Sequence, residues 1–481
     1  MKKINTLLIG SVMLASCTAK QEKEQLPNIV FILADDLGYG DLSCYGQKKF
    51  STPNIDRLAA EGMLFTQHYT GCTVSAPSRS SLMTGLHTGH TPIRGNKEWD
   101  TEGQWPLKSE SVTIAELLKL KGYETGAFGK WGLGFIGTEG DPNRQGFDEF
   151  YGYNCQRLAH NYYPDHLWHN SEKVTLSEND MGKSGAYSPD LIHKAALEFL
   201  KKNRNNPFFL FYPTTIPHAE LFAKEDYMKK FRGNYDPEKI FKGVDDGPSF
   251  RTGAYGSQPE AHAAFAAMVT QLDDYVGDLM KNLRKLGLDK NTIVIFASDN
   301  GPHLEGGADP DFFDSNGPLK GYKRDVYEGG IRTPLLVSWP GKVQPGTRSE
   351  HISAFWDFMP TFAEIAGIDS LPQTDGISML PELLGKEQKK HDFLYWEFHE
   401  GGGRVAVRMN DWKAVKPDIE KIPHGPTELY DLKTDIGETL NIAAEHRDIV
   451  HIMDSLIELS HVKSDDFPFS CEAADKKHEI K

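Results

Sequence analysis

The sequence predicts an α/β fold: a large mixed, mostly parallel sheet between helices, followed by a small C-terminal antiparallel sheet with a helix. Up to about residue 371, short apolar runs alternate with longer amphipathic segments, which is typical of a parallel sheet covered by helices on both faces. Beyond that point the apolar runs become short and closely spaced. Because 481 residues are too many for one small core, we expect an α/β domain over 26–371 and a small subdomain over 372–481.

Apolar runs mark the strands of the main domain. The run NIVFILA at residues 28–34 is continuous rather than alternating, and it ends in two aspartates. Such runs are typical of strands that are buried on both faces of a sheet. On this basis, strands are predicted over 27–36, 63–65, 124–128, 207–212 and 292–297.

Capping residues mark the helices. Thr52 and Pro53 open a helix that Gly62 ends, and Ser111 is expected to cap the run VTIAELLKLK. A long amphipathic helix is predicted over 260–286. In the small subdomain, strands are predicted over 393–397, 404–408 and 412–415, a helix over 446–459, and a loose polar tail from Glu472.

The N-terminus predicts export. A basic start precedes an apolar run at residues 7–14, which is too short to span a bilayer. The following Leu-Ala-Ser-Cys resembles a lipobox, so residues 1–17 are predicted to be a lipoprotein signal peptide whose Cys17 carries the lipid. The protein would then be exported and membrane-anchored, in the periplasm or at the surface of a Gram-negative bacterium. A plain secretory signal with a chance cysteine is the alternative.

The net charge and the cysteine spacing each argue against one class of ligand, nucleic acids and structural zinc respectively. The net charge of −15 argues against a nucleic-acid partner, which usually binds a basic surface. Outside the signal, Cys44, Cys72, Cys155 and Cys471 form no CxxC pair, so a structural zinc site is not expected. The spacing leaves open whether these cysteines form disulfides or remain isolated buried thiols.

Acidic and amide side chains follow two predicted strands. Asp35 and Asp36 end the first strand, and Asp299 and Asn300 end the strand over 292–297. Adjacent carboxylates are unfavourable without a neutralising cation, and oxygen ligands without nearby His or Cys favour Ca²⁺ or Mg²⁺. Each acid could instead be a capping or turn residue. Two such pairs after two apolar strands favour a metal site.

The pentapeptide SAPSR at residues 75–79 lies between a strand and a helical segment. Ser75 is expected at or just before the helix N-terminus, where free N–H groups favour an anion. Pro77 fits the first helical turn. From this stretch alone, Ser75 is either a helix cap or a nucleophile.

The motifs together resemble a known family. They are SAPSR with the following LMTG, ADDLGYGDLSCYG, TPNIDRLAAEG, GKWGLG, IPHAE, FASDNG, YEGGIRTP and ELYDLKTDIGET, which extend from Asn28 to about Ala444. This pattern is similar to the formylglycine-dependent, serine-type (type I) sulfatases, which are arylsulfatase-like members of the alkaline phosphatase superfamily. The resemblance implies an alkaline-phosphatase-like fold, makes 26–371 the catalytic domain, and points to a Bacteroides-type carbohydrate sulfatase lipoprotein.

The resemblance also implies roles for individual residues. Ser75 would be oxidised to formylglycine (3-oxoalanine) by a serine-type maturase, and one Ca²⁺ would be held by Asp35, Asp36, Ser75, Asp299 and Asn300. Arg79 would hold the formylglycine hydrate, and Lys130 and Lys323 the sulfate. His218 would face the ester oxygen as the general acid. One hydroxyl of the hydrate would carry the sulfate while the other expels it, so that a difficult step is split in two.

The chain departs from the family at Gly132, where many relatives carry a histidine that binds sulfate or assists breakdown of the hydrate. His303 is the candidate to take over that space. Further substrate contacts are expected at the following residues: His160, with Asn161 and Tyr162 behind it; His90, Arg94 and Asn96; Lys320; and Glu397, His399 and Arg404 at the pocket rim.

The function expected from these motifs is hydrolysis of O-sulfate esters on a carbohydrate. Host or algal sulfated polysaccharides and mucin glycans fit, with sulfated galactose preferred over N-acetylglucosamine. One alternative is a phosphomonoesterase or phosphodiesterase of the same superfamily, which would need a two-zinc site with several histidines. The other is a catalytically impaired lipoprotein that binds sulfated glycans.

Overall fold

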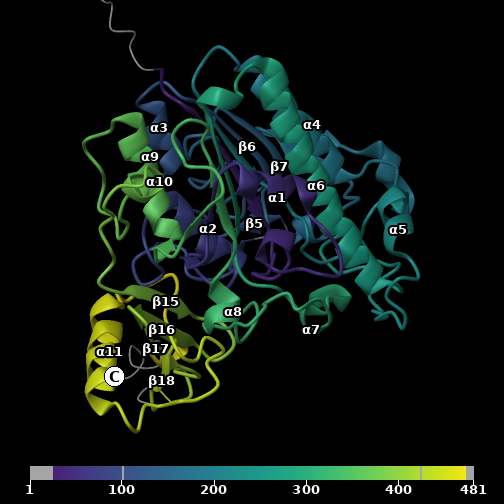
Figure 1. The fold of residues 1–481 in the computed structure, drawn as a ribbon. Helices are drawn as coiled ribbons and strands as arrows, with labels where there is room; N and C mark the ends of the chain where they lie inside the picture. Colours follow the sequence, from purple (N-terminus) through teal and green to yellow (C-terminus); the bar gives the residue numbers. More distant parts are fainter. Residues whose placement is uncertain (1–24, 100–101, 423–424, 473–481) are drawn as a thin grey trace, which may run out of the picture.

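The computed structural model describes residues 25–99, 102–422 and 425–472 (Figure 1). A ten-stranded sheet forms its centre, in the order β13-β2-β12-β11-β1-β10-β6-β7-β8-β9. The central strands β11, β1, β10, β6 and β7 are parallel to one another, whereas β12, β2, β8 and β9 introduce antiparallel pairs. The predicted mixed, mostly parallel sheet with a small C-terminal antiparallel sheet is confirmed.

The strands of the large sheet are β1 (Asn28–Ala34), β2 (Met63–Phe65), β6 (Glu124–Lys130), β7 (Glu149–Tyr153), β8 (His166–His169), β9 (Glu172–Thr175), β10 (Phe208–Pro213), β11 (Thr292–Ser298), β12 (Leu335–Ser338) and β13 (Thr347–Ser349). Two further pairs are β3 (His68–Tyr69) with β14 (Ser353–Ala354), and β4 (Glu98–Trp99) with β5 (Gly103–Gln104).

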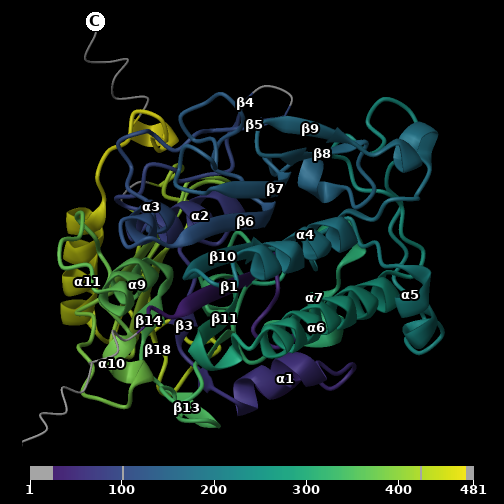
Figure 2. The same cartoon turned by 90° about the horizontal axis from the view of Figure 1, so that it is seen from above.

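Helices cover both faces of the large sheet (Figure 2). One face carries α1 (Pro53–Ala60), α4 (Ser188–Lys202), α5 (Glu225–Phe231) and α6 (Ala261–Leu286). The other carries α2 (Ser75–Thr84), α3 (Ile114–Lys119), α9 (Phe358–Ala366) and α10 (Leu380–Leu383). The remaining short helices of the main body are α7 (Pro310–Phe313), α8 (Glu328–Ile331) and the 3-10 turns Ser43–Tyr45, Leu158–His160, Ser177–Gly182, Asp289–Asn291, Glu305–Gly307 and Phe355–Asp357.

Strand β1 shows why a continuous apolar run is needed at the centre of the sheet. Val30 and Ile32 pack into the core under α1, α4 and α6. Ile29 and Phe31 point the opposite way, into the core under α2, α3 and α9. Successive side chains of a strand alternate between faces, so a strand covered on both sides must be apolar at every position.

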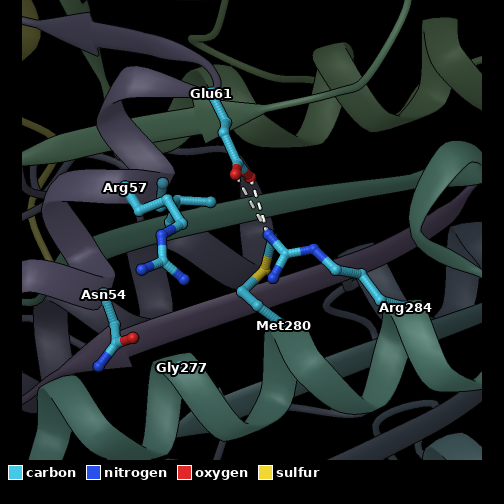
Figure 3. A pocket seen from close by; sticks show the side chains of 7 residues that line it. Asn54, Arg57, Glu61, Gly277, Met280 and Arg284 are labelled. Carbon is cyan, nitrogen blue, oxygen red and sulfur yellow. Dashed lines mark hydrogen bonds and ion pairs between the residues drawn. The ribbon is translucent and has the colours of Figure 1, made fainter.

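Helices α1 and α6 pack closely because of one small residue. A Cβ on Gly277 of α6 would lie 2.5 Å from the side-chain carbonyl carbon of Asn54 in α1, so only glycine allows this approach. Arg284 of α6 reaches Glu61, just after α1, at 3.0 Å (Figure 3). This pair is exposed and contributes little to stability.

The C-terminal sheet is antiparallel, in the order β15-β16-β17-β18, and α11 packs on one face of it. Its elements are β15 (Leu394–Phe398), β16 (Arg404–Met409), β17 (Trp412–Lys416), β18 (Glu428–Asp431) and α11 (Arg447–Ser460). The sequence analysis missed β18, because four residues with two acids carry almost no strand signal.

Of the two predicted helix caps, one is confirmed in position and the other is wrong. Thr52 is the N-cap residue of α1, as predicted, although its hydroxyl makes no capping bond and contacts Ser43 and Asp56 instead. The cap of α3 is Thr113, with a capping box to Glu116, rather than Ser111, so the helix begins later than expected.

The structure tests the predictions for the cysteines and the two termini only where it describes those residues. Within the described segments, Cys44, Cys72, Cys155 and Cys471 are all free thiols. Among these segments no helix has the length and apolar character needed to cross a membrane. Cys17, the signal peptide over 1–17 and the tail over 473–481 lie outside the described residues.

Replacing Gly129 with alanine is expected to destabilise the fold strongly. Gly129 has a φ of +140°, and a Cβ there would lie 1.8 Å from the carbonyl oxygen of Pro213 in β10. We expect Gly129→Ala to lower the free energy of unfolding in urea by at least about 3 kcal/mol. Gly122→Ala is the matched control: Gly122 has a φ of +79° and no described atom within 4 Å of its Cβ position, so we expect a loss of only about 1 kcal/mol. Equal losses would contradict the close-contact explanation.

Candidate functional site

Four neighbouring parallel strands deliver the site residues to one edge of the large sheet. Asp35 and Asp36 follow β1, Asp299 follows β11, and Lys130 ends β6. His218 follows β10 in a loop tied to the end of β1, where Asp35 N–H donates to Ile216 O at 3.1 Å. Open α/β sheets hold their ligands outside the carboxyl ends of such strands, so this edge is the natural place for a site.

Ser75 is the first residue of α2 and lies at the centre of this edge. Val74, in an extended conformation, precedes it. Its Oγ lies 2.8 Å from Asp299 Oδ2 and 3.1 Å from Asp35 Oδ1, and Lys130 Nζ donates to it at 3.1 Å. The dipole of α2, whose N-terminal end begins at Ser75, adds a field that favours an anion at this position. The hydroxyl is therefore surrounded by both proton acceptors and a cation.

Buried charges of both signs surround Ser75. The three pairs are Lys130 Nζ with Asp35 Oδ2 at 2.5 Å, Arg79 Nη2 with Asp299 Oδ2 at 2.8 Å, and Lys323 Nζ with Asp36 Oδ2 at 2.8 Å. All six side chains are buried. Arg79 is fixed further by Nη1, which donates to Lys130 O at 2.6 Å. Charges are buried at a high desolvation cost, so such a cluster points to binding or catalysis rather than to stability.

The two lysines are in different electrostatic environments. Burial lowers the pKa of Lys130, and Asp35 only partly opposes this effect. Burial also acts against the charge of Lys323, but the carboxylates of Asp36 and Glu305 outweigh it and raise the pKa of that ammonium. Lys323 therefore keeps its proton firmly.

His218 lies against Lys323. Its Nε2 is 3.0 Å from Lys323 Nζ, and its Nδ1 is hydrogen-bonded to the carbonyl oxygen of Ala219. Burial lowers the pKa of His218 well below its usual value, and the neighbouring Lys323 and Lys130 lower it further. The imidazole is thus neutral, with Nδ1–H donating and Nε2 accepting from the lysine.

The oxygen atoms at the strand ends fit a hard divalent cation. Within the described part of the chain, Asn300 Oδ1 is buried and has no hydrogen-bond partner, and Asp35 Oδ2 accepts no hydrogen bond although it lies close to Lys130. Asn300 Nδ2 donates to Asp36 Oδ1 at 2.7 Å, which ties the two strand ends together. Carboxylate and amide oxygens are the ligands that Ca²⁺ and Mg²⁺ prefer.

Three residues predicted to contact substrate lie close to this centre. His160 stacks on His218 with ring centroids 5.0 Å apart, and His303 stacks on the other side at 5.5 Å. Burial lowers the pKa of His160 to about 4, so this ring is neutral. Asn96 Oδ1 accepts the N–H of Ala76, beside Ser75, at 3.0 Å. Asn161 and Tyr162, the next two residues of the chain, are buried.

Other predicted substrate contacts are engaged elsewhere. Glu397 is fully buried, not at a rim, and accepts from Arg94 Nη1 at 2.8 Å and His399 Nε2 at 2.9 Å. The contact with Arg94 joins the C-terminal sheet to the main domain. His90 pairs with Asp375 at 2.9 Å, beside the C-terminal end of α2 rather than the N-terminal end.

Two further predicted contacts border the C-terminal sheet. Lys320 Nζ bonds to Glu438 O at 3.1 Å and lies 3.9 Å from the ring centre of Tyr327. Arg404 pairs with Asp325 Oδ1 at 2.7 Å, in the segment that follows Lys323.

Two residues of the site carry no signal in the sequence. The ring centres of Tyr255 and His160 lie 4.9 Å apart, although the two residues are 95 positions apart in the sequence. Gln156 lies against Gly132, and its amide occupies the space that a side chain at position 132 would need. Only the folded chain brings these residues to the site, so no local pattern could have indicated them.

Comparison with known proteins identifies the family. Residues 27–368 match the sulfatase family model, and residues 321–463 match the model described as N-sulphoglucosamine sulphohydrolase, C-terminal. Human arylsulfatase A is 33% identical, covering 86% of this chain and 83% of that protein. The N-acetylgalactosamine-6-O-sulfatase of Bacteroides thetaiotaomicron is 31% identical, covering 94% of this chain and 97% of that protein.

Solved structures agree with these matches. The crystal structure of Ps i-CgsB in complex with k-i-k-neocarrahexaose has a TM-score of 0.77 at 30% identity, covering 95% of this chain and 98% of that one. A Bacteroides fragilis protein described as a putative sulfatase has a TM-score of 0.70 at 24% identity, which shows a common fold. The sulfatase family model spans most of the chain. The two curated matches cover 83% and 97% of the relatives' own lengths. The chain therefore belongs to the sulfatase family, the sulfuric ester hydrolases.

Proposed function

We propose that this sulfatase removes O-sulfate from a carbohydrate, using formylglycine made from Ser75 and one Ca²⁺. The observation that carries the proposal is the position of Ser75 Oγ, which lies at a helix N-terminus between two carboxylates and Lys130. A sulfate ester brings anionic oxygens to this point. The helix terminus and the buried cations Arg79, Lys130 and Lys323 supply the complementary field.

The residues around Ser75 would control protons and charge at the reacting oxygen. Oxidation of Ser75 supplies an aldehyde whose hydrate offers one hydroxyl to accept sulfate and a second to expel it. Asp35 and Asp299 lie within hydrogen-bonding distance of the side-chain oxygen at residue 75 and can accept its proton. Lys130 Nζ holds a positive charge 3.1 Å from the same oxygen, where negative charge develops.

The leaving group would be served by His218 and Lys323. A sugar alkoxide is a poor leaving group and must be protonated as it departs. Lys323 holds a proton 3.0 Å from His218 Nε2, so the pair can deliver a proton through the imidazole. His218 would therefore be part of a two-residue donor, because the neutral ring alone carries its only proton on Nδ1, toward Ala219 O.

The metal proposal rests on Asp35, Asp36, Asp299 and Asn300, with residue 75 beside them. A bound Ca²⁺ would offset negative charge on the sulfuryl oxygens. The buried Asn300 Oδ1, without a hydrogen-bond partner among the described residues, is the atom that most directly supports a cation here. The relatives named above are sulfatases, and sulfatases generally use formylglycine and a divalent metal.

Removing Ca²⁺ is expected to destabilise the protein measurably. If the ion binds only the folded state, saturating Ca²⁺ should raise the melting temperature of chelator-treated protein by about 3 °C or more. Asp299→Asn should abolish this shift. Asp273→Asn, which alters a buried carboxylate that accepts from Asn54 and Ile55 at the α1–α6 contact, should keep it. Elemental analysis showing two zinc ions per chain would favour a phosphoesterase and overturn the Ca²⁺ proposal.

The substrate proposal is a sulfated glycan with galactose-type sugars. The bacterial relative is named for N-acetylgalactosamine 6-O-sulfate, and the complex of Ps i-CgsB contains k-i-k-neocarrahexaose. In this chain the rings of His160 and Tyr255 stand beside His218 and offer flat apolar faces to a sugar.

A direct test is a screen of sulfated monosaccharides with protein co-produced with a serine-type maturase. Galactose 6-sulfate and N-acetylgalactosamine 6-sulfate should release inorganic sulfate, and the corresponding phosphate esters should be poor substrates. Tight binding of all sulfated sugars without sulfate release would instead indicate a glycan-binding protein. Preferential hydrolysis of phosphate esters would indicate a phosphoesterase.

A further inference from the structure

Gln156 carries a buried hydrogen-bond donor that the fold does not use. The residue follows β7 and is 8% exposed. Its Nε2 is buried and has no hydrogen-bond partner anywhere in the described segments. A buried amide N–H without an acceptor is unfavourable by about 1–3 kcal/mol, so the group is expected to have a function or a ligand.

Hydrogen bonds of two backbone N–H groups hold the segment that carries this amide. Gly132 N–H donates to Asn154 O at 3.0 Å, which ties the segment after β7 to the segment after β6. Gln156 N–H donates to Gln104 Oε1 at 3.1 Å. These bonds fix the backbone that carries Gln156, and neither of them gives its Nε2 an acceptor.

The amide occupies the space next to Gly132. A Cβ at position 132 would lie 2.2 Å from Gln156 Nε2 and 3.9 Å from Arg79 Cδ. A side chain at 132 and the amide of Gln156 therefore exclude each other. Gly132 lies two residues after Lys130 in the chain. Because it has no side chain, it leaves room for the Gln156 amide beside Arg79.

Two buried side-chain atoms without a hydrogen-bond partner suit ligands of opposite charge. Asn300 Oδ1 is an acceptor and suits a cation, whereas Gln156 Nε2 is a donor and suits an anion. Arg79 and Lys130, the nearest members of the cation cluster, would attract the same anion. A sulfate group has several acceptor oxygens, more than one cation can satisfy.

We propose that Gln156 Nε2 donates a hydrogen bond to an oxygen of the sulfate group, beside Arg79. The proposal rests on the sulfatase function proposed above and adds a residue of this chain to it. It also gives a reason for glycine at 132, which admits the amide. Unlike a histidine at that position, an amide has no proton to gain or lose near neutral pH, so its contribution would not vary with pH.

The test compares isosteric variants of Gln156 in the matured protein. Gln156→Glu keeps the shape but replaces the donor by an anion, and Gln156→Leu keeps most of the volume without a donor. We expect both to weaken binding of inorganic sulfate, measured by calorimetry, by about 10-fold or more, and to lower kcat/KM for the sulfated sugar by about 100-fold. Melting temperatures should remain close to wild type.

A reciprocal exchange provides the control. Gly132→His alone should be impaired, because the imidazole meets the Gln156 amide. In Gly132→His/Gln156→Gly the space is exchanged, and we expect sulfate affinity to recover at least about 5-fold over Gln156→Gly and to rise below about pH 6.5, as the imidazole protonates. Wild-type sulfate affinity should show no such imidazole titration from this position.

The outcomes separate this proposal from the sulfatase proposal. Unchanged sulfate affinity in Gln156→Glu and Gln156→Leu would overturn the role of Gln156, even in an active sulfatase. A wild-type protein that does not bind inorganic sulfate would overturn it too. A wild-type protein that binds sulfate through Gln156 but hydrolyses no ester would support the donor and contradict the proposed catalysis.

Discussion

Ser75→Ala is expected to abolish sulfate release. The alanine removes the oxygen that lies between Asp35, Asp299 and Lys130, and it removes the carbon that would be oxidised. We expect kcat/KM on the sulfated sugar to fall by about 10⁴-fold or more, because the covalent route is lost altogether. Release of inorganic sulfate from matured wild-type and variant protein, prepared in parallel, measures the effect.

Ser80→Ala is the matched control for this experiment. Ser80 lies in the same helix, is also buried, and its hydroxyl contacts Thr91 at 2.6 Å rather than any charged group of the site. We expect its activity to stay within about 3-fold of wild type. Equal sulfate release by Ser75→Ala and wild type would show that Ser75 is not the nucleophile.

His218→Ala is expected to slow hydrolysis in proportion to how poor the leaving group is. Without His218, the proton on Lys323 Nζ loses the imidazole that accepts from it at 3.0 Å. For a sugar sulfate, whose alkoxide must be protonated, we expect kcat/KM to fall by about 10²–10³-fold. For 4-nitrophenyl sulfate, whose phenolate leaves unprotonated, we expect a loss of less than about 10-fold.

His193→Ala is the control for this comparison. His193 is also a buried histidine, but it lies on α4 and pairs with Asp278 at 3.2 Å. Its replacement should affect both esters equally and weakly. If His218→Ala slows both esters by the same factor, His218 positions substrate or metal and does not take part in proton donation.

The sequence predicted the elements at the sheet centre because their local signal is strong. β1 is apolar from Ile29 to Ala34 and β11 from Ile293 to Ala297, and both strands are followed by acids, so their type and their shared edge could be inferred. Short outer elements such as β18 have no comparable signal. Their strand conformation comes from pairing with β17, which is a tertiary contact.

The sequence predicted the site residues that belong to motifs. It could not predict the surroundings of residues that only the fold brings into place. Asp35, Asp299 and Lys130 lie at the carboxyl ends of β1, β11 and β6, which are parallel strands of one sheet with only β10 between β1 and β6, so strand ends sufficed to place them at the same edge. Glu397 looked like a rim residue, yet it is buried among basic side chains, which lower the pKa of its carboxyl well below the usual value despite burial. Gln156 was missed because its role depends on the absent side chain at Gly132.

The central claim is that Ser75 reacts only after oxidation to formylglycine. The most direct measurement is mass spectrometry of the peptide that contains residue 75, in preparations made with and without a serine-type maturase, alongside sulfate release from the same samples. We predict that the peptide loses two hydrogen atoms in the matured sample and that turnover rises in proportion to the oxidised fraction. Full turnover by a sample whose Ser75 remains unoxidised would contradict the account.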